Sequence, residues 1–216
     1  MKIIALSDLH GNLDRLDAIA DELRAADLLL VSGDITKSGS ADEAAGIIRT
    51  LQEYNAALLA VHGNRDFPEV ATALDEAGVG LHARGTIVDG IGFFGAGGGR
   101  TTRFHTACEY SEGEILEFLQ RGFAAVAGAR RVVLLSHMPP KGVRDRMFLG
   151  FRAGSAVVRD FISGNRVDLC VCGHIHEARG TERLIDTMVA NAGSFRNGWY
   201  ARIELDRTVT VTIERA

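Results

Sequence analysis

The sequence is poor in cysteine and proline, and this scarcity bears on its class. Its 216 residues include three cysteines and three prolines. An odd number of cysteines does not suggest a disulfide framework. Cys170 and Cys172 alternate with Val171 in an expected strand, and we interpret them, together with Cys108, as small buried residues. We therefore expect neither disulfides nor a thiolate zinc site.

The sequence also lacks a long hydrophobic run and an excess of positive charge. No apolar run approaches the roughly 20 residues that span a bilayer, and the opening MKIIALSD reaches Asp8 too early for a signal-peptide core. We expect a cytoplasmic protein with no membrane partner. The formal net charge is −4 and the basic residues are scattered, so nucleic-acid binding is not indicated. A small phosphate-bearing substrate fits better.

The first half of the chain predicts parallel strands joined by helices. At 46% hydrophobic content, 216 residues favour one domain covering residues 1–216. Short apolar runs alternate with stretches of helical period, which is typical of a βαβαβ order. The expected strands are 2–6, 28–31 and 56–61, and the expected helices are 13–26, with Asn12 as a favoured N-cap, 41–54 and 68–77.

The second half mixes other patterns. Asp89-Gly90 indicates a hairpin between strands 86–88 and 91–94, and Ser111 with Glu114 reads as a capping box. Further expected elements are a helix to about residue 127, strand 131–135, helix 155–162, strand 169–172 and a tail hairpin of 200–205 with 209–213. Parallel strands from the first half and antiparallel strands from the tail predict two packed mixed sheets covered by helices. The long loops 97–109 and 137–153 are more typical of functional than of idle segments.

Polar side chains follow five of the apolar runs, just where each run ends. These candidate ligands are Asp8, His10, Asp34, Asn64, His137, His174 and His176. Ligands of open α/β sheets gather at the carboxyl ends of strands. The i, i+2 spacing within two pairs of these residues keeps both side chains on one side of an extended segment. Glycines beside the candidates, at positions 11, 33, 63 and 173, allow sharp turns and close approach.

The donor set itself predicts the kind of metal. Two carboxylates, one amide and four imidazoles suit Mn, Fe, Zn or Co better than Ca or Mg. Seven ligands exceed the need of one ion, but two ions that share a carboxylate and a hydroxide use them all. Such a centre is positively charged and attracts a phosphate anion.

Five short motifs resemble those of the calcineurin-like metallophosphoesterases, in the same order. They are DLHGN at 8–12, GD at 33–34, GNRD at 63–66, SH at 136–137 and GHIH at 173–176. Further stretches, PEV at 68–70, FHTACEYSEGE at 104–114, HMPP at 137–140 and CGHIHEARG at 172–180, resemble small Icc-related predicted phosphoesterases of archaea and bacteria.

This resemblance implies an α/β fold, a four-layer αββα sandwich of two mixed sheets flanked by helices, with two metals at its rim. One metal would take Asp8, His10, Asp34 and His176, and the other would take Asp34, Asn64, His137 and His174. Asp34 would bridge the two ions, and a bridging hydroxide would attack phosphorus in line with the leaving oxygen.

One position departs from the family pattern. Where many members have GNHD, with a histidine credited with stabilising the transition state or protonating the leaving group, this chain has Arg65. An arginine cannot donate a proton near neutral pH, but its planar fork can clamp phosphate oxygens. The alternative is a salt bridge from Arg65 to Asp66 or another acid. His105, in the loop 97–109, is a candidate leaving-group acid or a structural loop histidine. Arg65, Asn64 and His105 are thus the candidate catalytic residues.

The leading hypothesis is a metallophosphoesterase acting on a small phosphate ester, with a phosphodiester favoured and nucleotides among the candidates. Manganese is one of the expected metals. A binding scaffold that has lost catalysis and a nuclease are the alternatives. Complete ligand positions argue against the scaffold, and the charge and length argue against the nuclease. An oligomer is neither required nor excluded by the sequence.

Overall fold

The structure of the protein, a computed structural model, describes residues 1–103, 105–148 and 150–216. The first residue of the motif at 104–114 therefore lies outside the described residues. Within them, no helix has the length and apolar character needed to cross a membrane.

The first sheet is built from both ends of the chain. Its order is β13 (Val209–Arg215), β12 (Trp199–Leu205), β1 (Lys2–Leu6), β2 (Leu28–Ser32) and β3 (Leu58–Val61). Strands β1, β2 and β3 are parallel, whereas β12 pairs antiparallel with both β1 and β13. The carboxyl ends of the three parallel strands therefore meet at one edge.

The second sheet comes from the middle of the chain. Its order is β10 (Gly180–Leu184), β11 (Thr187–Asn191), β9 (Leu169–Cys172), β8 (Arg131–Ser136), β5 (Ile91–Ala96) and β4 (Gly85–Val88). The four inner strands are parallel and the two edge strands antiparallel. Both sheets are thus mixed, as predicted.

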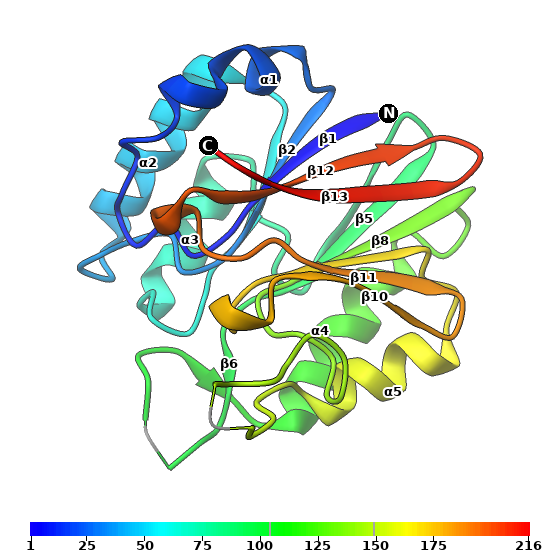
Figure 1. The fold of residues 1–216 in the computed structure, drawn as a ribbon. Helices are drawn as coiled ribbons and strands as arrows, with labels where there is room; N and C mark the ends of the chain where they lie inside the picture. The colour runs from blue at the N-terminus through cyan, green and yellow to red at the C-terminus, as the bar shows by residue number, and fades with distance from the viewer. Residues whose placement is uncertain (104, 149) are drawn as a thin grey trace.

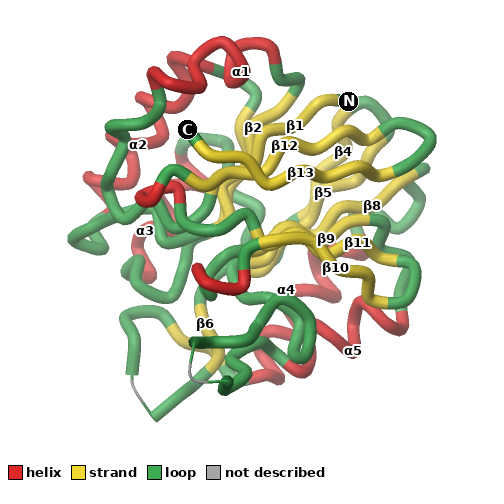
Figure 2. Tube along the Cα trace, in the orientation of Figure 1, coloured by secondary structure: helices red, strands yellow, loops and turns green. Residues whose placement is uncertain are grey.

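Helices cover the outer faces of the two sheets, which gives four layers (Figures 1 and 2). Helices α1 (Ala20–Ala25), α2 (Ala41–Tyr54) and α3 (Pro68–Glu76) lie on the side of the first sheet, and α4 (Glu112–Ala124) and α5 (Ala156–Gly164) on that of the second. Side chains of a strand alternate between two cores: Ile4 packs toward the first helices and Ile3 toward the other sheet. Likewise Val132 faces the second set of helices and Val133 the space between the sheets. The predicted αββα sandwich is confirmed.

Three details differ from the sequence-based expectations. The expected helix 13–26 is only the 3₁₀ turn η1 (Asp17–Ile19) followed by α1, and Asn12 caps no helix because its side chain bonds with Asp14 instead. The tail is not purely antiparallel, since β11 pairs in parallel with β9. The loop 97–109 contains part of a small two-stranded pair, β6 (Gly99–Arg100) with β7 (Glu109–Tyr110). All three cysteines are buried, as expected.

Candidate metal centre

The seven candidate ligands follow the carboxyl ends of five strands that converge on one edge of the sandwich. Asp8 and His10 follow β1, Asp34 follows β2 and Asn64 follows β3. From the second sheet, His137 follows β8, and His174 and His176 follow β9. Because β1 and β9 belong to different sheets, this edge joins the two halves of the fold.

The backbone is strained where these side chains are presented. Asp8, His10, Asp34 and His174 have φ values of 52°, 48°, 49° and 66°, a left-handed region that non-glycine residues seldom adopt. Such strain persists only where the surrounding structure enforces it, and it clusters at functional sites.

Two glycines make the close approach of the ligand loops possible. A Cβ added to Gly63 would lie 2.1 Å from Asp34 Oδ1, and one added to Gly173 would lie 1.8 Å from Ser7 Oγ. Any side chain at these positions would therefore push the loops apart. The sequence-based reading of these two glycines is in keeping with this crowding.

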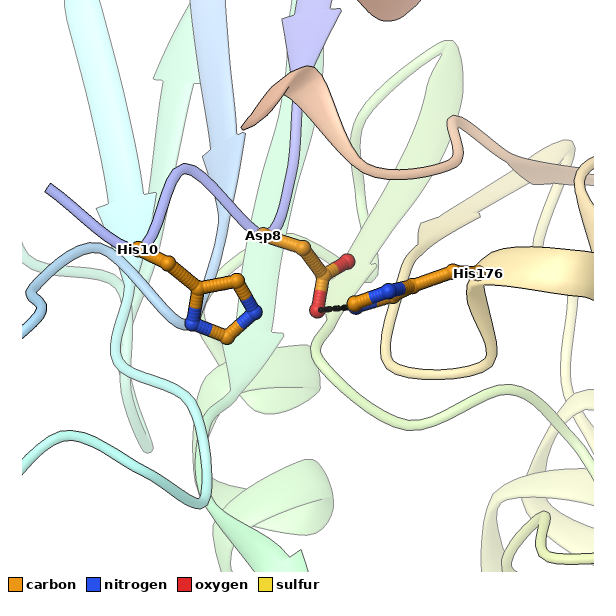
Figure 3. Close-up of side chains that lie close together, drawn as sticks. All are labelled: Asp8, His10 and His176. Atoms are coloured by element: carbon orange, nitrogen blue, oxygen red, sulfur yellow. Dashed lines mark ion pairs between the residues drawn. The ribbon is translucent and has the colours of Figure 1, made fainter. Parts of the chain in front are cut away.

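The first group of ligand atoms surrounds the carboxylate of Asp8, which is fully buried. His10 and His176 lie on either side of it (Figure 3), with His176 Nε2 3.1 Å from Asp8 Oδ1. Asp8 Oδ2 accepts hydrogen bonds from Ser7 Oγ at 2.7 Å and from the His174 backbone N–H at 3.0 Å. Asp8 Oδ1, although close to His176, is buried without a hydrogen-bond partner among the described residues.

The second group joins Asp34 and His137 to Asp8. His137 Nδ1 lies 2.8 Å from the Ser32 carbonyl oxygen, to which it donates, so that in the neutral form of the ring Nε2 carries the lone pair. That lone pair faces two oxygens, Asn64 Oδ1 at 3.0 Å and Asp34 Oδ1 at 3.5 Å. Three electron-rich atoms that face each other call for a cation between them.

Asp34 belongs to the second group and also faces a histidine of the first, whereas Asp8 belongs to both groups. Its Oδ2 is 3.8 Å from His10 Nε2 and its Oδ1 is 3.5 Å from His137 Nε2. Burial raises the pKa of Asp34 to about 6, against the attraction of His137. Burial also raises the pKa of Asp8, but the contact with His176 and the charges of His137 and His176 outweigh it and lower the value to about 2.

The pKa values of two candidate ligands, His10 and His174, suit metal binding. Burial lowers the pKa of His174 to about 3 and also lowers the pKa of His10, so both rings are neutral at pH 7. Neutral imidazole is the form that ligates metals. The contact with Asp8 raises the pKa of His176. The buried Asp8 oxygen without a hydrogen bond, the acceptors around His137 and the neutral rings of His10 and His174 all fit a divalent metal centre.

A buried carboxylate that the sequence analysis did not assign to the site, Asp66, ties two of the ligand loops together. It accepts hydrogen bonds from the backbone N–H groups of Ile35 at 3.1 Å, Thr36 at 2.9 Å and Gly63 at 2.7 Å, and from Thr36 Oγ1 at 2.7 Å. It thereby fixes the loop after β2 to the loop after β3. The GNRD motif contained this residue, but the contacts 30 residues away could not be inferred from spacing.

The remaining catalytic candidates occupy different places. Arg65 is exposed, and its backbone N–H donates to Asp34 Oδ1 at 2.9 Å. Burial is the main cause of the lowered pKa of His10 and His174, and the positive charge of Arg65 is a smaller cause. The Asp66 carboxylate accepts hydrogen bonds from backbone N–H groups, and not from the side chain of Arg65. His105 is exposed and, among the described residues, it contacts no candidate ligand.

Comparison with known proteins agrees with this fold. Residues 1–178 match the family model of the calcineurin-like phosphoesterases. The chain therefore belongs to the calcineurin-like phosphoesterases.

Individual relatives extend the similarity over most of the chain. An uncharacterized protein of Methanocaldococcus jannaschii, MJ1162, is 32% identical over 198 residues, which cover 88% of this chain and 87% of the relative. The crystal structure of TT1561 of Thermus thermophilus superposes with a TM-score of 0.76 at 19% identity, covering 99% and 98% of the two chains. A novel archaeal phosphodiesterase superposes with a TM-score of 0.56 at 17% identity, covering 99% of this chain and 100% of the other.

Proposed function

We propose that the protein is a two-metal phosphodiesterase that hydrolyses small phosphate diesters. The observation that carries this proposal is the position of Asp34, whose two carboxylate oxygens face a histidine from each of the two ligand groups. A carboxylate placed in this way suits the bridge of a dinuclear centre.

The ligands divide between two ions. Asp8, His10, Asp34 and His176 would hold one ion, and Asp34, Asn64, His137 and His174 would hold the other. Mn, Fe, Zn and Co suit this mixed oxygen and nitrogen set. When bound, the two ions supply the nucleophile and the positive charge for in-line attack on phosphorus.

The chain's own residues position and stabilise the substrate. The Ser32 carbonyl holds His137 in the tautomer that leaves Nε2 free. Asn64 Oδ1 lies 3.0 Å from His137 Nε2, beside the ring atom that the Ser32 carbonyl leaves free. Arg65 clamps a nonbridging phosphate oxygen through its guanidinium, which carries its charge throughout the reaction. His105 donates a proton to a leaving group that needs one.

Two observations support a diester substrate. The archaeal protein with the same fold is a phosphodiesterase. Arg65 stands where many relatives have a histidine, and an arginine stabilises charge without giving up a proton, which suits a leaving group that departs easily or finds its proton elsewhere.

The test is hydrolysis of bis-p-nitrophenyl phosphate and p-nitrophenyl phosphate by metal-stripped protein resupplied with Mn, Fe, Zn, Co or Mg. We expect metal-dependent turnover, faster on the diester. Asp34→Asn should lower it at least about a hundredfold, because the charge that joins both ions is lost. Asp21→Asn, whose carboxylate is fully exposed on the surface, is the matched control and should keep full activity.

Metal content separates the alternatives. If Asp34→Asn binds fewer ions but wild-type protein turns over neither substrate with any metal, the binding-scaffold hypothesis replaces the enzyme. Faster hydrolysis of the monoester would contradict the proposed diester preference.

A further inference from the structure

A cavity of about 500 Å³ lies directly beside the metal-ligand loop and has no part in the metal centre. Its walls come from residues within 142–148 and 150–152, from the turn η2 (His176–Ala178) and from β10. Glu177 and Ala178 line it and immediately follow the candidate ligand His176. A group attached to a phosphate at the metals therefore has this space within reach.

Hydrogen bonds fix the cavity wall to the ligand loop. Asn191 Nδ2 lies 3.3 Å from the Arg144 carbonyl, and it also donates to the carbonyls of Gly173 at 3.1 Å and Ile175 at 3.0 Å. The Phe148 backbone N–H donates to Glu177 Oε1 at 2.7 Å. The wall and the loop that carries His174 and His176 thus form one connected unit.

Most charges on the cavity wall are paired. Arg152 Nη1 contacts the fully buried carboxylate of Asp145 at 2.7 Å. Arg144 Nε lies 3.5 Å from Glu182 Oε2. Arg146 is exposed and, across the described part of the chain, forms no ion pair. It is therefore the guanidinium available to an anionic ligand.

An aromatic ring, that of Phe148, also borders the cavity, and the described residues leave it largely exposed. Phe148 lines the cavity and is 91% exposed, an unusual environment for so large an apolar side chain. Phe151, on the same segment, is 69% exposed but does not line the cavity. A planar ligand would bury the face of Phe148 and gain stacking energy that an exposed ring lacks.

We propose that this cavity binds the nucleoside part of a small nucleotide whose phosphate lies at the metals. The base stacks on Phe148, and Arg146 meets a further anionic group or an acceptor atom of the base. This proposal rests on the proposed function for the placement of the phosphate, and it narrows the substrate class from small diesters to nucleotide diesters.

The test compares the binding of AMP and of inorganic phosphate to manganese-loaded protein by isothermal titration calorimetry. We expect wild-type protein to bind AMP more tightly than phosphate. Phe148→Ala should weaken AMP binding about tenfold, as loss of one stacking contact does, and Arg146→Ala should weaken it severalfold. Neither variant should change phosphate binding, because neither Phe148 nor Arg146 is one of the seven candidate metal ligands.

Two matched controls keep the test specific. Phe151→Ala removes an exposed ring from the same segment outside the cavity, and Arg207→Ala removes an exposed arginine from the β12–β13 turn; both should leave AMP binding unchanged. Equal AMP and phosphate affinities in wild type, or equal losses in Phe148→Ala and Phe151→Ala, would overturn the inference. Because the readout is binding, absent turnover would contradict the proposed function alone.

Discussion

The ligand groups and the segment 146–148 beside them are built in opposite ways. Asp8 and Asp34 are 0% and 2% exposed, lie on strained backbone and are fixed by hydrogen bonds from both sheets. Phe148 and Arg146, by contrast, are exposed side chains on a surface segment. The buried metal ligands can keep one chemistry. Substitutions at the exposed residues can change which substrate binds, at little cost to the stability of the fold. The predictions below test that division.

The largest effect outside the ligands themselves is expected at Asp66. Asp66→Asn keeps the shape but faces an amide N–H₂ toward backbone donors, so the loops after β2 and β3 lose their common acceptor. We expect metal affinity to fall between about tenfold and a hundredfold, as is usual when groups behind metal ligands are changed. Metal titration of the variant measures it. Unchanged affinity would mean that the loops hold their positions without this carboxylate.

Arg65→Ala is expected to lower kcat/KM about tenfold, which corresponds to one hydrogen bond to a charged group. Metal content should not change, because only the backbone N–H of Arg65 contacts a candidate ligand. Arg65→Lys should recover part of the rate through its charge. Full activity of Arg65→Ala on every substrate tried would exclude the proposed clamp.

The effect of His105→Ala is expected to depend on whether the leaving group needs a proton. We expect kcat to fall about tenfold for an alkyl phosphodiester, whose alkoxide needs a proton, and to stay the same for p-nitrophenyl esters. The modest size reflects the exposure of the imidazole. An equal loss with both esters would assign His105 a structural role in its loop.

The smallest effect is expected at Glu109, whose carboxylate binds both Thr102 and Thr106. It accepts from the backbone N–H and the hydroxyl of both Thr102 and Thr106, at 2.8 to 3.1 Å. Desolvation raises the pKa of Glu109, but these bonds outweigh it and lower the value to about 2. Because the folded pKa is depressed, the stabilisation is present above the ordinary pKa of about 4.3 and is lost as the pH falls toward 2.

Glu109→Gln should release the loop at neutral pH. We expect faster hydrogen exchange at the amide of Thr106 and unchanged turnover of bis-p-nitrophenyl phosphate. Glu117→Gln, on the exposed face of α4, is the control. Loss of turnover in Glu109→Gln would show that catalysis depends on the position of this loop, as it does on the buried ligand groups.

Sequence reasoning succeeded where local pattern decides the structure. The buried run 2–6 and the periodic stretch 41–54 match β1 and α2 because short range hydrophobic order fixes them. It failed at residues 13–16, where Leu13 and Leu16 have helical spacing but pack against the core from turns. It missed β10, because the edge sequence GTERL carries polar and exposed residues.

The candidate site shows the same limit. Each ligand follows the end of a strand that was expected from the sequence, so their convergence could be predicted from sheet topology. The tautomer of His137 depends on the Ser32 carbonyl, 105 positions away, and the cavity depends on Asn191 holding Arg144. Such contacts arise only from tertiary packing, and no motif marks them.

The origin of the ligands in two sheets has a mechanical consequence. Asp8 accepts a hydrogen bond from the backbone of His174, so the first and the ninth strands meet at one carboxylate. Metal ions bound at this position would hold the two sheets of the sandwich together. Loosening the contact between the sheets, for instance at the fully buried Ala5, is therefore expected to release metal before the protein unfolds. Catalytic activity is therefore expected to fall when the contact between the two sheets is loosened.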